Sequence, residues 1–302
     1  MKRNRLGASE LYVSEIGLGC MSLGTEEKEA ARLVHEALDR GINFLDTADL
    51  YDEGRNEEIV GQALKSRRSD VILATKVGNR RIPGKEGWSW DPSKSYIKAA
   101  VKDSLRRLQT DYIDLYQLHG GTLDDPIDET IEAFEELKQE GVIRFYGISS
   151  IRPNVIREYV KRSNIVSVMS QYSILDRRPE EEVLPLLAEN GISVIARGPV
   201  ASGVLAEAGA GKVNKGYLDY TPEELLEIRR KLESLVRPER SMSQTAIRYS
   251  LEQPVVAAAI PGASSLKQLI HNVAASESPV LSPEELDYIR SISRANVYTA
   301  NR

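Results

Sequence analysis

Short apolar runs alternate with longer amphipathic stretches along almost the whole chain. Each apolar run has the length and the β-branched content typical of a strand. The predicted strands cover 16–19, 42–46, 71–76, 112–118, 142–148, 165–170, 192–196 and 255–260. Each is followed by apolar residues at helical spacing, which predicts helices over 26–40, 57–64, 93–108, 127–140, 153–162, 179–190, 222–235 and 265–275.

Eight strand–helix alternations of this kind are the signature of parallel βαβ units. Eight units also favour closure into a (β/α)8 TIM barrel, an α/β fold, over an open sheet. Such barrels of about 250 residues fold as one domain, so we expect a single domain over 1–302. Residues 3–14 predict an N-terminal hairpin, and helices over 241–252 and 282–294 are expected outside the eightfold plan.

Three predicted connections at the carboxyl ends of the strands are long: 77–92, 119–126 and 197–221. The first contains both tryptophans, Trp88 and Trp90, and the third is rich in glycine and contains Tyr217 and Tyr220. Long ordered loops are often functional, which favours substrate walls and a lid over 197–221. The alternative is that these aromatic residues only hold the loops against the barrel rim.

Polar residues of a special kind end three of the predicted strands. Asp46 ends one, with Tyr51 five residues later, while Lys76 and His119 end the next two along the chain. In a parallel barrel these ends meet at one face, where active sites are built. The sequence therefore predicts one site that contains all four side chains.

The chemistry of these four residues favours proton transfer to a carbonyl oxygen. A buried Lys76 needs a partner, for which Asp46 is suitable. An adjacent ammonium lowers the pKa of a phenol from about 10, which would make Tyr51 a proton donor nearer physiological pH. A neutral imidazole at His119 could orient the carbonyl oxygen. Taken singly, Lys76 could face solvent, Tyr51 is one of 13 tyrosines, and a lone histidine is usually structural.

Other chemistries lack their motifs. Cys20 is the only cysteine and no two histidines are close in sequence, so no zinc pattern is present and no metal is expected. The chain has neither a G-x-S-x-G nucleophile turn nor a P-loop. The four residues cannot supply a hydride, which a nicotinamide cofactor would provide.

Charge and hydropathy disfavour several classes of partner. A net charge of -5 and a pI near 5.5 disfavour nucleic acid or an anionic membrane as partner. No stretch approaches about 18 uninterrupted apolar residues, and the first residues lack the apolar segment of a signal peptide. The lone cysteine fits a reducing compartment. We expect a cytoplasmic protein acting on a small molecule, and its oligomeric state stays open.

With these residues in view, the chain resembles the aldo-keto reductase family, in its bacterial NADP-dependent oxidoreductase branch. The resemblance runs from Gly17 to about Asn272 through F-L-D-T-A-D-L-Y (44–51), A-T-K-V-G (74–78), D-Y-I-D-L-Y-Q-L-H (111–119), G-I-S-S (147–150), S-Q-Y (170–172) and I-P-G-A-S (260–264). It implies a catalytic tetrad of Asp46, Tyr51, Lys76 and His119 and the reduction of aldehydes and ketones to alcohols. Tyr51 would be the general acid.

The resemblance also implies a bound NADPH. Ser149, Ser150 and Gln171 would hold the carboxamide, Tyr172 would stack on the ring, and 197–203 would follow the pyrophosphate. The residues implied in cofactor binding are Gly19, Met21, Asp46, Ser149, Ser150, Gln171, Arg197, Gly198, Pro199, Val200, Gly203, Gly262, Ser264, Gln268 and Asn272. Trp88, with Tyr51 and His119, would contact the substrate.

Two departures from the family pattern bear on the cofactor. Ser150 stands where many members have asparagine. The stretch 260–272 lacks the lysine and arginine that many members place on the 2′-phosphate. Backbone N–H groups at a helix N-terminus, with Ser264, Ser265 and Lys267, could still hold a phosphate, so NADPH is predicted over NADH.

Two alternatives compete with this hypothesis. Gly17 and Gly19 before a strand that ends in Asp46 imitate a Rossmann dehydrogenase, but Gly24 comes too late for G-x-G-x-x-G. An open sheet would also leave Lys76 and His119 without a shared site. The other alternative is a non-catalytic, cofactor-binding redox sensor on the same barrel. The intact tetrad favours catalysis.

Overall fold

The computed structural model describes residues 1–82, 84 and 87–302. In this part of the chain, eight parallel strands form one sheet in the order β12-β11-β10-β9-β8-β5-β4-β3. Their bounds are β3 Leu18–Gly19, β4 Phe44–Asp46, β5 Ile72–Val77, β8 Ile113–Leu118, β9 Ile143–Ser149, β10 Ser167–Gln171, β11 Ser193–Arg197 and β12 Val256–Ile260. Bridges from Ile16 to Ala259 and from Gly19 to Gly262 join the first strand to the last, which confirms the predicted barrel.

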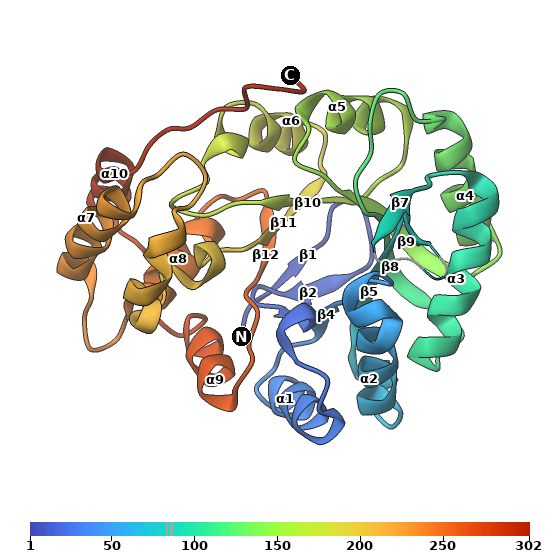
Figure 1. Ribbon diagram of the computed structural model, residues 1–302, viewed down its shortest axis with the longest axis horizontal. Coiled ribbons are helices and arrows are strands. Elements are labelled where there is room, and N and C mark those ends of the chain that lie inside the picture. Colours follow the sequence, from blue (N-terminus) through green and yellow to red (C-terminus); the bar gives the residue numbers. More distant parts are fainter. Residues whose placement is uncertain (83, 85–86) are drawn as a thin grey trace.

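The helices surround this ring of strands (Figure 1). Most of them present a buried apolar face to the barrel and a polar face to solvent. They are α1 Glu27–Asp39, α2 Arg55–Leu64, α3 Lys94–Leu108, α4 Ile127–Gln139, α5 Pro153–Arg162, α6 Val183–Glu189, α7 Pro222–Leu232, α8 Met242–Leu251, α9 Leu266–Ala274 and α10 Pro283–Ile292.

One helix assignment from the sequence is wrong. The stretch 222–235 was expected to be the barrel helix after β11, with 241–252 as an extra. In the structure α8 packs against β12 and α9, and Met242 through Ser250 are all buried. The helix α7 instead packs against α10 and the 3₁₀ segment Glu207–Lys215, outside the ring (Figure 1).

The barrel interior is apolar at its amino-terminal end and polar at the other. The predicted hairpin, β1 Arg3–Arg5 with β2 Tyr12–Ser14, covers the amino-terminal end. Its Leu6, Leu11 and Val13 form one buried cluster with strand residues such as Phe44 and Leu115. Because side chains alternate between the two faces of a strand, the next inward positions after Phe44 and Leu115 are Asp46 and Gln117. Polar side chains therefore fill the carboxyl end.

A second hairpin interrupts the first long connection, which was predicted as an irregular loop. The strands β6 Asn79–Arg81 and β7 Trp88–Trp90 pair antiparallel, with Asn79 opposite Trp90. The third connection is also ordered, as the 3₁₀ segments Ala201–Gly203 and Glu207–Lys215.

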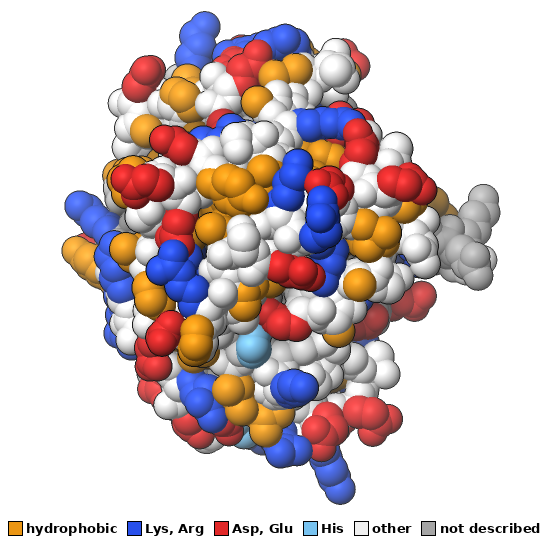
Figure 2. Space-filling model, turned by 90° about the vertical axis from the view of Figure 1, so that its left-hand side faces the viewer, with side chains coloured by type: hydrophobic (Ala, Val, Ile, Leu, Met, Phe, Trp, Pro, Cys, Tyr) orange, Lys and Arg blue, Asp and Glu red, His pale blue; other side chains and the backbone are white. Residues whose placement is uncertain are grey.

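Acidic and basic side chains are interspersed on the face that Figure 2 shows, so neither sign of charge dominates there. Among the described residues, no helix combines the length and the apolar composition needed to cross a membrane.

Candidate active site

Lys76 lies at the centre of the polar end of the barrel. Its ammonium donates to Asp46 Oδ2 at 2.7 Å and to the carbonyl oxygen of Thr47 at 2.7 Å, and its Nζ lies 3.3 Å from Tyr51 Oη. The side chain is 1% exposed. The predicted pairing of Lys76 with Asp46 is thus present, and it leaves the ammonium directed at the phenol.

Asp46 has a second partner that the sequence analysis missed. Gln117, an inward residue of β8, donates from Nε2 to Asp46 Oδ1 at 3.3 Å. Burial raises the pKa of the Asp46 carboxyl, while Lys76 and Gln117 act to lower it. The period of two in β8 was the available signal, since it puts Gln117 on the same face as His119.

Tyr51 and His119 face each other across the mouth of the barrel. Their ring centroids are 6.1 Å apart and the rings are nearly perpendicular, at 85°. Tyr51 is placed by a tight turn after β4, in which its N–H donates to the Ala48 carbonyl at 3.2 Å. The His119 N–H donates to the Val77 carbonyl at 2.7 Å, which ties the end of β8 to β5.

The pKa of Tyr51 moves opposite to the sequence-based expectation. Burial raises it above its ordinary value, and the lowering effect of Lys76 is smaller. The expectation considered the cation and left out desolvation, which is the largest influence on the partly buried Tyr51 phenol. The consequence is that Tyr51 holds its proton throughout the physiological range.

His119 is neutral, as expected. Burial, together with the positive charges of Lys76 and Arg197, lowers its pKa to about 3. For Lys76 itself, burial lowers the pKa, but Asp46 and Tyr51 together raise it above its ordinary value, so the ammonium persists. The site thus combines a protonated phenol, a fixed cation and a neutral imidazole.

The structure gathers the residues expected at the cofactor along one side of the same face. Ser149 ends β9 and Ser150 follows it, Gln171 ends β10 and Arg197 ends β11. Gln171 Nε2 donates to Tyr217 Oη at 2.9 Å, so the third long connection closes over this edge. Gly198, Pro199, Val200 and Gly203 continue directly from β11 into the 3₁₀ turn.

The other half of the expected cofactor site lies between β3, β12 and α9. Asn272 Nδ2 donates to the Gly262 carbonyl at 3.1 Å, and the Ser264 N–H and hydroxyl donate to Gln268 Oε1. Gly19 forms its bridge with Gly262 here, and Met21 stands exposed on the turn that follows. The residues of this half were expected at one site, and the structure brings them together.

One aromatic prediction needs correction. Tyr172 was expected to stack on the nicotinamide ring, but it is fully buried, donates to Glu180 Oε1 at 3.0 Å and packs against Tyr249. It points away from the barrel interior, because it follows the inward Gln171 by one residue.

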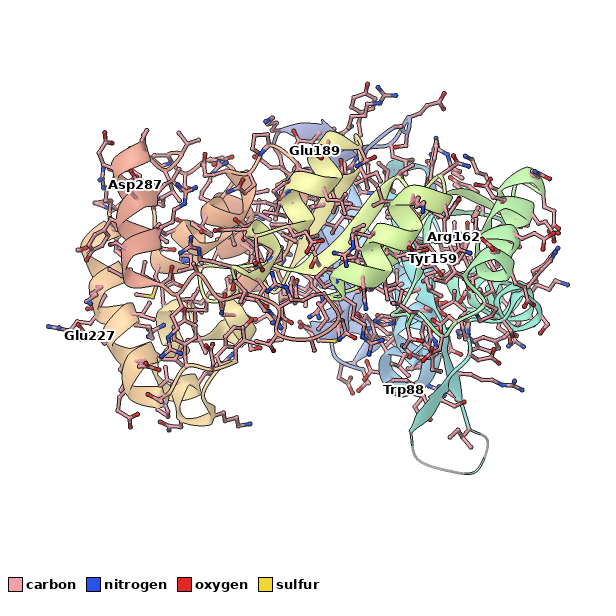
Figure 3. All side chains as sticks on the ribbon, turned by 90° about the horizontal axis from the view of Figure 1, so that it is seen from above. Trp88, Tyr159, Arg162, Glu189, Glu227 and Asp287 are labelled. Carbon is pink, nitrogen blue, oxygen red and sulfur yellow. The ribbon has the colours of Figure 1, made fainter. Side chains whose placement is uncertain are left out.

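Trp88, which was expected at the substrate, is 50% exposed on the projecting hairpin (Figure 3). Trp90 of the same hairpin packs against the barrel. Its indole N–H donates to Asp125 Oδ1 at 2.9 Å and its ring covers Gly78 and Gly120, the residue after His119.

Lys212 is a further residue that the sequence analysis missed. Its ammonium lies directly beside Gly203, where an added Cβ would collide with it. Gly203 also has a φ of +84°, which glycine adopts without strain. Nothing in the sequence pattern predicts that a lysine nine residues later would fold back onto this turn.

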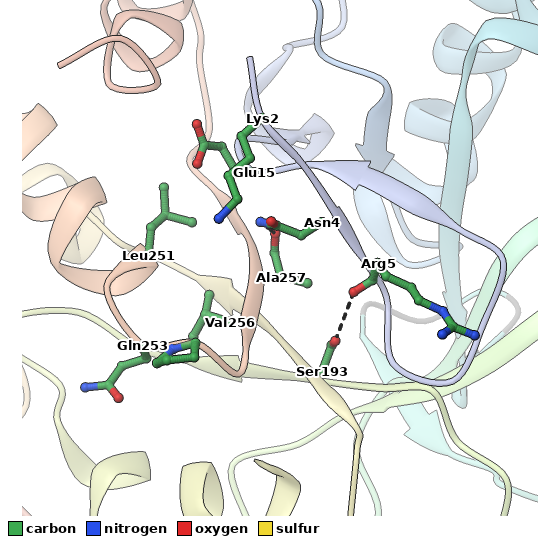
Figure 4. Close-up of a pocket in the computed structure, with 10 residues that line it drawn as sticks. Lys2, Asn4, Arg5, Glu15, Ser193, Leu251, Gln253, Val256 and Ala257 are labelled. Atoms are coloured by element: carbon green, nitrogen blue, oxygen red, sulfur yellow. Dashed lines mark hydrogen bonds between the residues drawn. The ribbon is translucent and has the colours of Figure 1, made fainter. Parts of the chain in front are cut away.

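The opposite end of the barrel holds a polar hollow of about 280 Å³ (Figure 4). Lys2, Glu15 and Gln253 are among the residues that line it, and Ser193 Oγ donates to the Arg5 carbonyl at 3.4 Å. No member of the tetrad contributes to it.

Comparison with known proteins agrees with this geometry. The sequence model of the Aldo/keto reductase family matches residues 15–294. The chain is 60% identical, over all of both chains, to the uncharacterized oxidoreductase YqkF of Bacillus subtilis (strain 168). It is similar to the holo form of aldo-keto reductase AKR11C1 from Bacillus halodurans, with a TM-score of 0.95 and 61% identity over 100% of this chain and 99% of that one. The apo form of that reductase, covered to the same extent, gives a TM-score of 0.86 at 58% identity.

Proposed function

Because this chain belongs to the aldo/keto reductase family, an oxidoreductase family, we propose that it reduces aldehydes or ketones to alcohols with NADPH and uses Tyr51 as the general acid. The observation that supports this most directly is the position of the Lys76 ammonium, held by Asp46 and directed at Tyr51 Oη. That arrangement prepares a phenol to give up a proton and stabilises the phenolate that remains.

In this proposal each tetrad residue has a separate task. A bound reduced nicotinamide supplies the hydride to the carbonyl carbon. Tyr51 Oη gives its proton to the carbonyl oxygen, so that hydride and proton together convert the carbonyl to an alcohol. The neutral His119 imidazole donates a hydrogen bond that orients the oxygen, and Lys76 offsets the negative charge left on Tyr51.

The proposed cofactor site uses both halves of the predicted set. Ser149, Ser150 and Gln171 would hold the carboxamide. Lys212 joins the turn over 197–203 as a cation for the pyrophosphate. The N-terminus of α9, with Ser265 as its cap and Lys267 in its first turn, would favour the 2′-phosphate of NADPH over the hydroxyl of NADH. We further propose a cytoplasmic location, where the NADPH-dependent reaction has its cofactor.

Loss of NADPH absorbance with a panel of reactive aldehydes and ketones, run beside NADH, tests the activity. Tyr51→Phe should lower kcat by at least about 10²-fold and leave NADPH binding, followed by quenching of tryptophan fluorescence, unchanged. The exposed Tyr12→Phe is the matched control and should retain full turnover. Normal turnover of Tyr51→Phe would remove Tyr51 as the acid. No turnover of the wild type with either cofactor, despite tight binding of one, would favour the non-catalytic sensor.

A further inference from the structure

Asp49 is a buried carboxyl group that the proposed chemistry does not use. It lies in the turn between Asp46 and Tyr51, and its N–H donates to the Lys76 carbonyl at 3.4 Å. The residue is only 8% exposed, and the charges that act on its carboxyl include Glu57 of α2 and Arg107 of α3. Within the described part of the chain, its Oδ1 has no hydrogen-bond partner.

The groups that surround Asp49 compensate a negative charge there only in part. Glu57 of α2 is a second, fully buried carboxylate, and it already accepts from Arg107 Nε at 2.7 Å and from the Thr75 hydroxyl at 2.6 Å. The Arg107 guanidinium beside Asp49 is thus already paired with Glu57. Two buried carboxylates beside one guanidinium cannot both ionise cheaply.

Two phenols, Tyr96 and Tyr116, also feel the charge of Asp49. Burial and then the Asp49 carboxylate raise the pKa of Tyr96 to about 12, and the same two causes raise the pKa of Tyr116 well above its ordinary value. The Tyr116 hydroxyl also lacks a partner in the described residues. Burial and Glu57 raise the pKa of Asp49 itself to about 7, against the weaker lowering effects of Arg107, the Leu50 N–H and Lys76.

From this geometry we infer that Asp49 is a positioning residue for Tyr51, whose neutral carboxyl keeps the 46–51 turn folded against the barrel. Ionisation would leave a buried charge with the Leu50 N–H as its hydrogen-bond donor and no cation of its own, since Arg107 is paired with Glu57, at a cost of several kcal/mol. The turn can relieve that cost by moving Asp49 outward, and Tyr51 follows two residues later. Because Tyr51 Oη is 3.3 Å from Lys76 Nζ, a shift of about 1 Å breaks the contact, and such shifts can lower the rate about 10²-fold.

This inference rests on the proposed role of Tyr51 and predicts a specific pH dependence. Asp49 ionises well before the buried Tyr51 phenol does, so kcat of the wild type should fall as pH rises through neutrality, by up to about tenfold per pH unit. Asp49→Asn, which mimics the neutral form, should keep kcat within about threefold of the wild type at acidic pH and lose the fall near neutrality.

Two further variants sharpen the test. Asp52→Asn removes an exposed carboxylate three residues away, in the 3₁₀ segment that follows the turn, and should keep the wild-type profile. Glu57→Gln removes the competing carboxylate, so Asp49 should ionise more readily and the fall in kcat should move to lower pH. A fall near neutrality that persists unchanged in Asp49→Asn overturns the proposal, and so does a Glu57→Gln profile that moves to higher pH.

Infrared difference spectra between acidic and alkaline pH separate this proposal from the proposed function. Wild type minus Asp49→Asn should show a protonated carboxyl band that disappears near neutral pH, whether or not a carbonyl substrate is turned over. If that band is present and turnover is absent, the reductase proposal fails while the buried proton stands. If turnover is present and the band is absent, the Asp49 proposal fails alone.

Discussion

At the scale of single residues, Lys76 offers the most direct test of the site's electrostatics. Lys76→Met removes the cation that acts against burial on Tyr51, so the pKa of the phenol should rise further. We expect kcat to fall about 10²–10⁴-fold, the range for loss of positioned acid–base chemistry, and the alkaline limb that belongs to Tyr51 to move to higher pH. The pH–rate profile measured in an Asp49→Asn background isolates that limb. Lys102→Met, on the exposed face of α3, is the control, and an unmoved limb would contradict the role of Lys76.

The sequence predicted that Asp46, Tyr51, Lys76 and His119 would lie together, because strand ends and a period of two are local properties. All four follow from that pattern, and the family resemblance added the role of each. The pattern could not predict the pKa of Tyr51, which depends on how deeply the folded loops bury it. It also could not show that Glu57, a carboxylate eight residues later, would act on Asp49, because a residue in a turn has no fixed face.

At the scale of elements, the 3₁₀ segment Glu207–Lys215 depends on one carboxylate. Glu207 accepts from the Ser243 N–H and hydroxyl at 3.0 Å and lies 3.3 Å from His271 Nε2. Burial alone would raise its pKa, but the Ser243 N–H and other hydrogen bonds hold it at about 2.

Glu207→Gln should release the segment that brings Lys212 to Gly203. We expect the Kd for NADPH to rise about tenfold, the equivalent of one charge-assisted hydrogen bond, with kcat nearly unchanged. Equal affinity in Glu207→Gln and the exposed control Glu239→Gln would show that the contact does not hold the segment.

Element prediction failed where the pattern was ambiguous about partners. The periodicity over 222–235 and over 241–252 is helical in both cases, and only packing decides that the fully buried α8 belongs to the barrel. The hairpin of β6 and β7 was missed because β6 is polar throughout and the three residues of β7 are too few to show a period. The sequence also could not show which indole faces Gly120, since the register of that hairpin decides it.

At the scale of the whole molecule, two buried titratable groups give folding stability opposite dependences on pH. His119 has a folded-state pKa of about 3 against 6.5 when unfolded, so the unfolded chain binds the extra proton and stability rises with pH between those values. Asp49 has a folded-state pKa of about 7 against 3.8, so the folded chain binds the extra proton and stability falls with pH between those values. In the overlap, from pH 3.8 to 6.5, the two effects largely cancel.

Asp49→Asn removes the contribution of Asp49 to the pH dependence of stability and should leave that of His119. The free energy of unfolding of the variant minus that of the wild type should rise by about 1.4 kcal/mol per pH unit across the overlap and become constant above about pH 7. Urea unfolding at a series of pH values measures this difference, in which the contribution of His119 and of all other shared groups cancels. Asp52→Asn should give a difference that does not change with pH. A pH-independent difference for Asp49→Asn as well would mean that Asp49 is ionised in the folded protein. The turn that bears Tyr51 would then have to stabilise a buried charge throughout the working range of the enzyme.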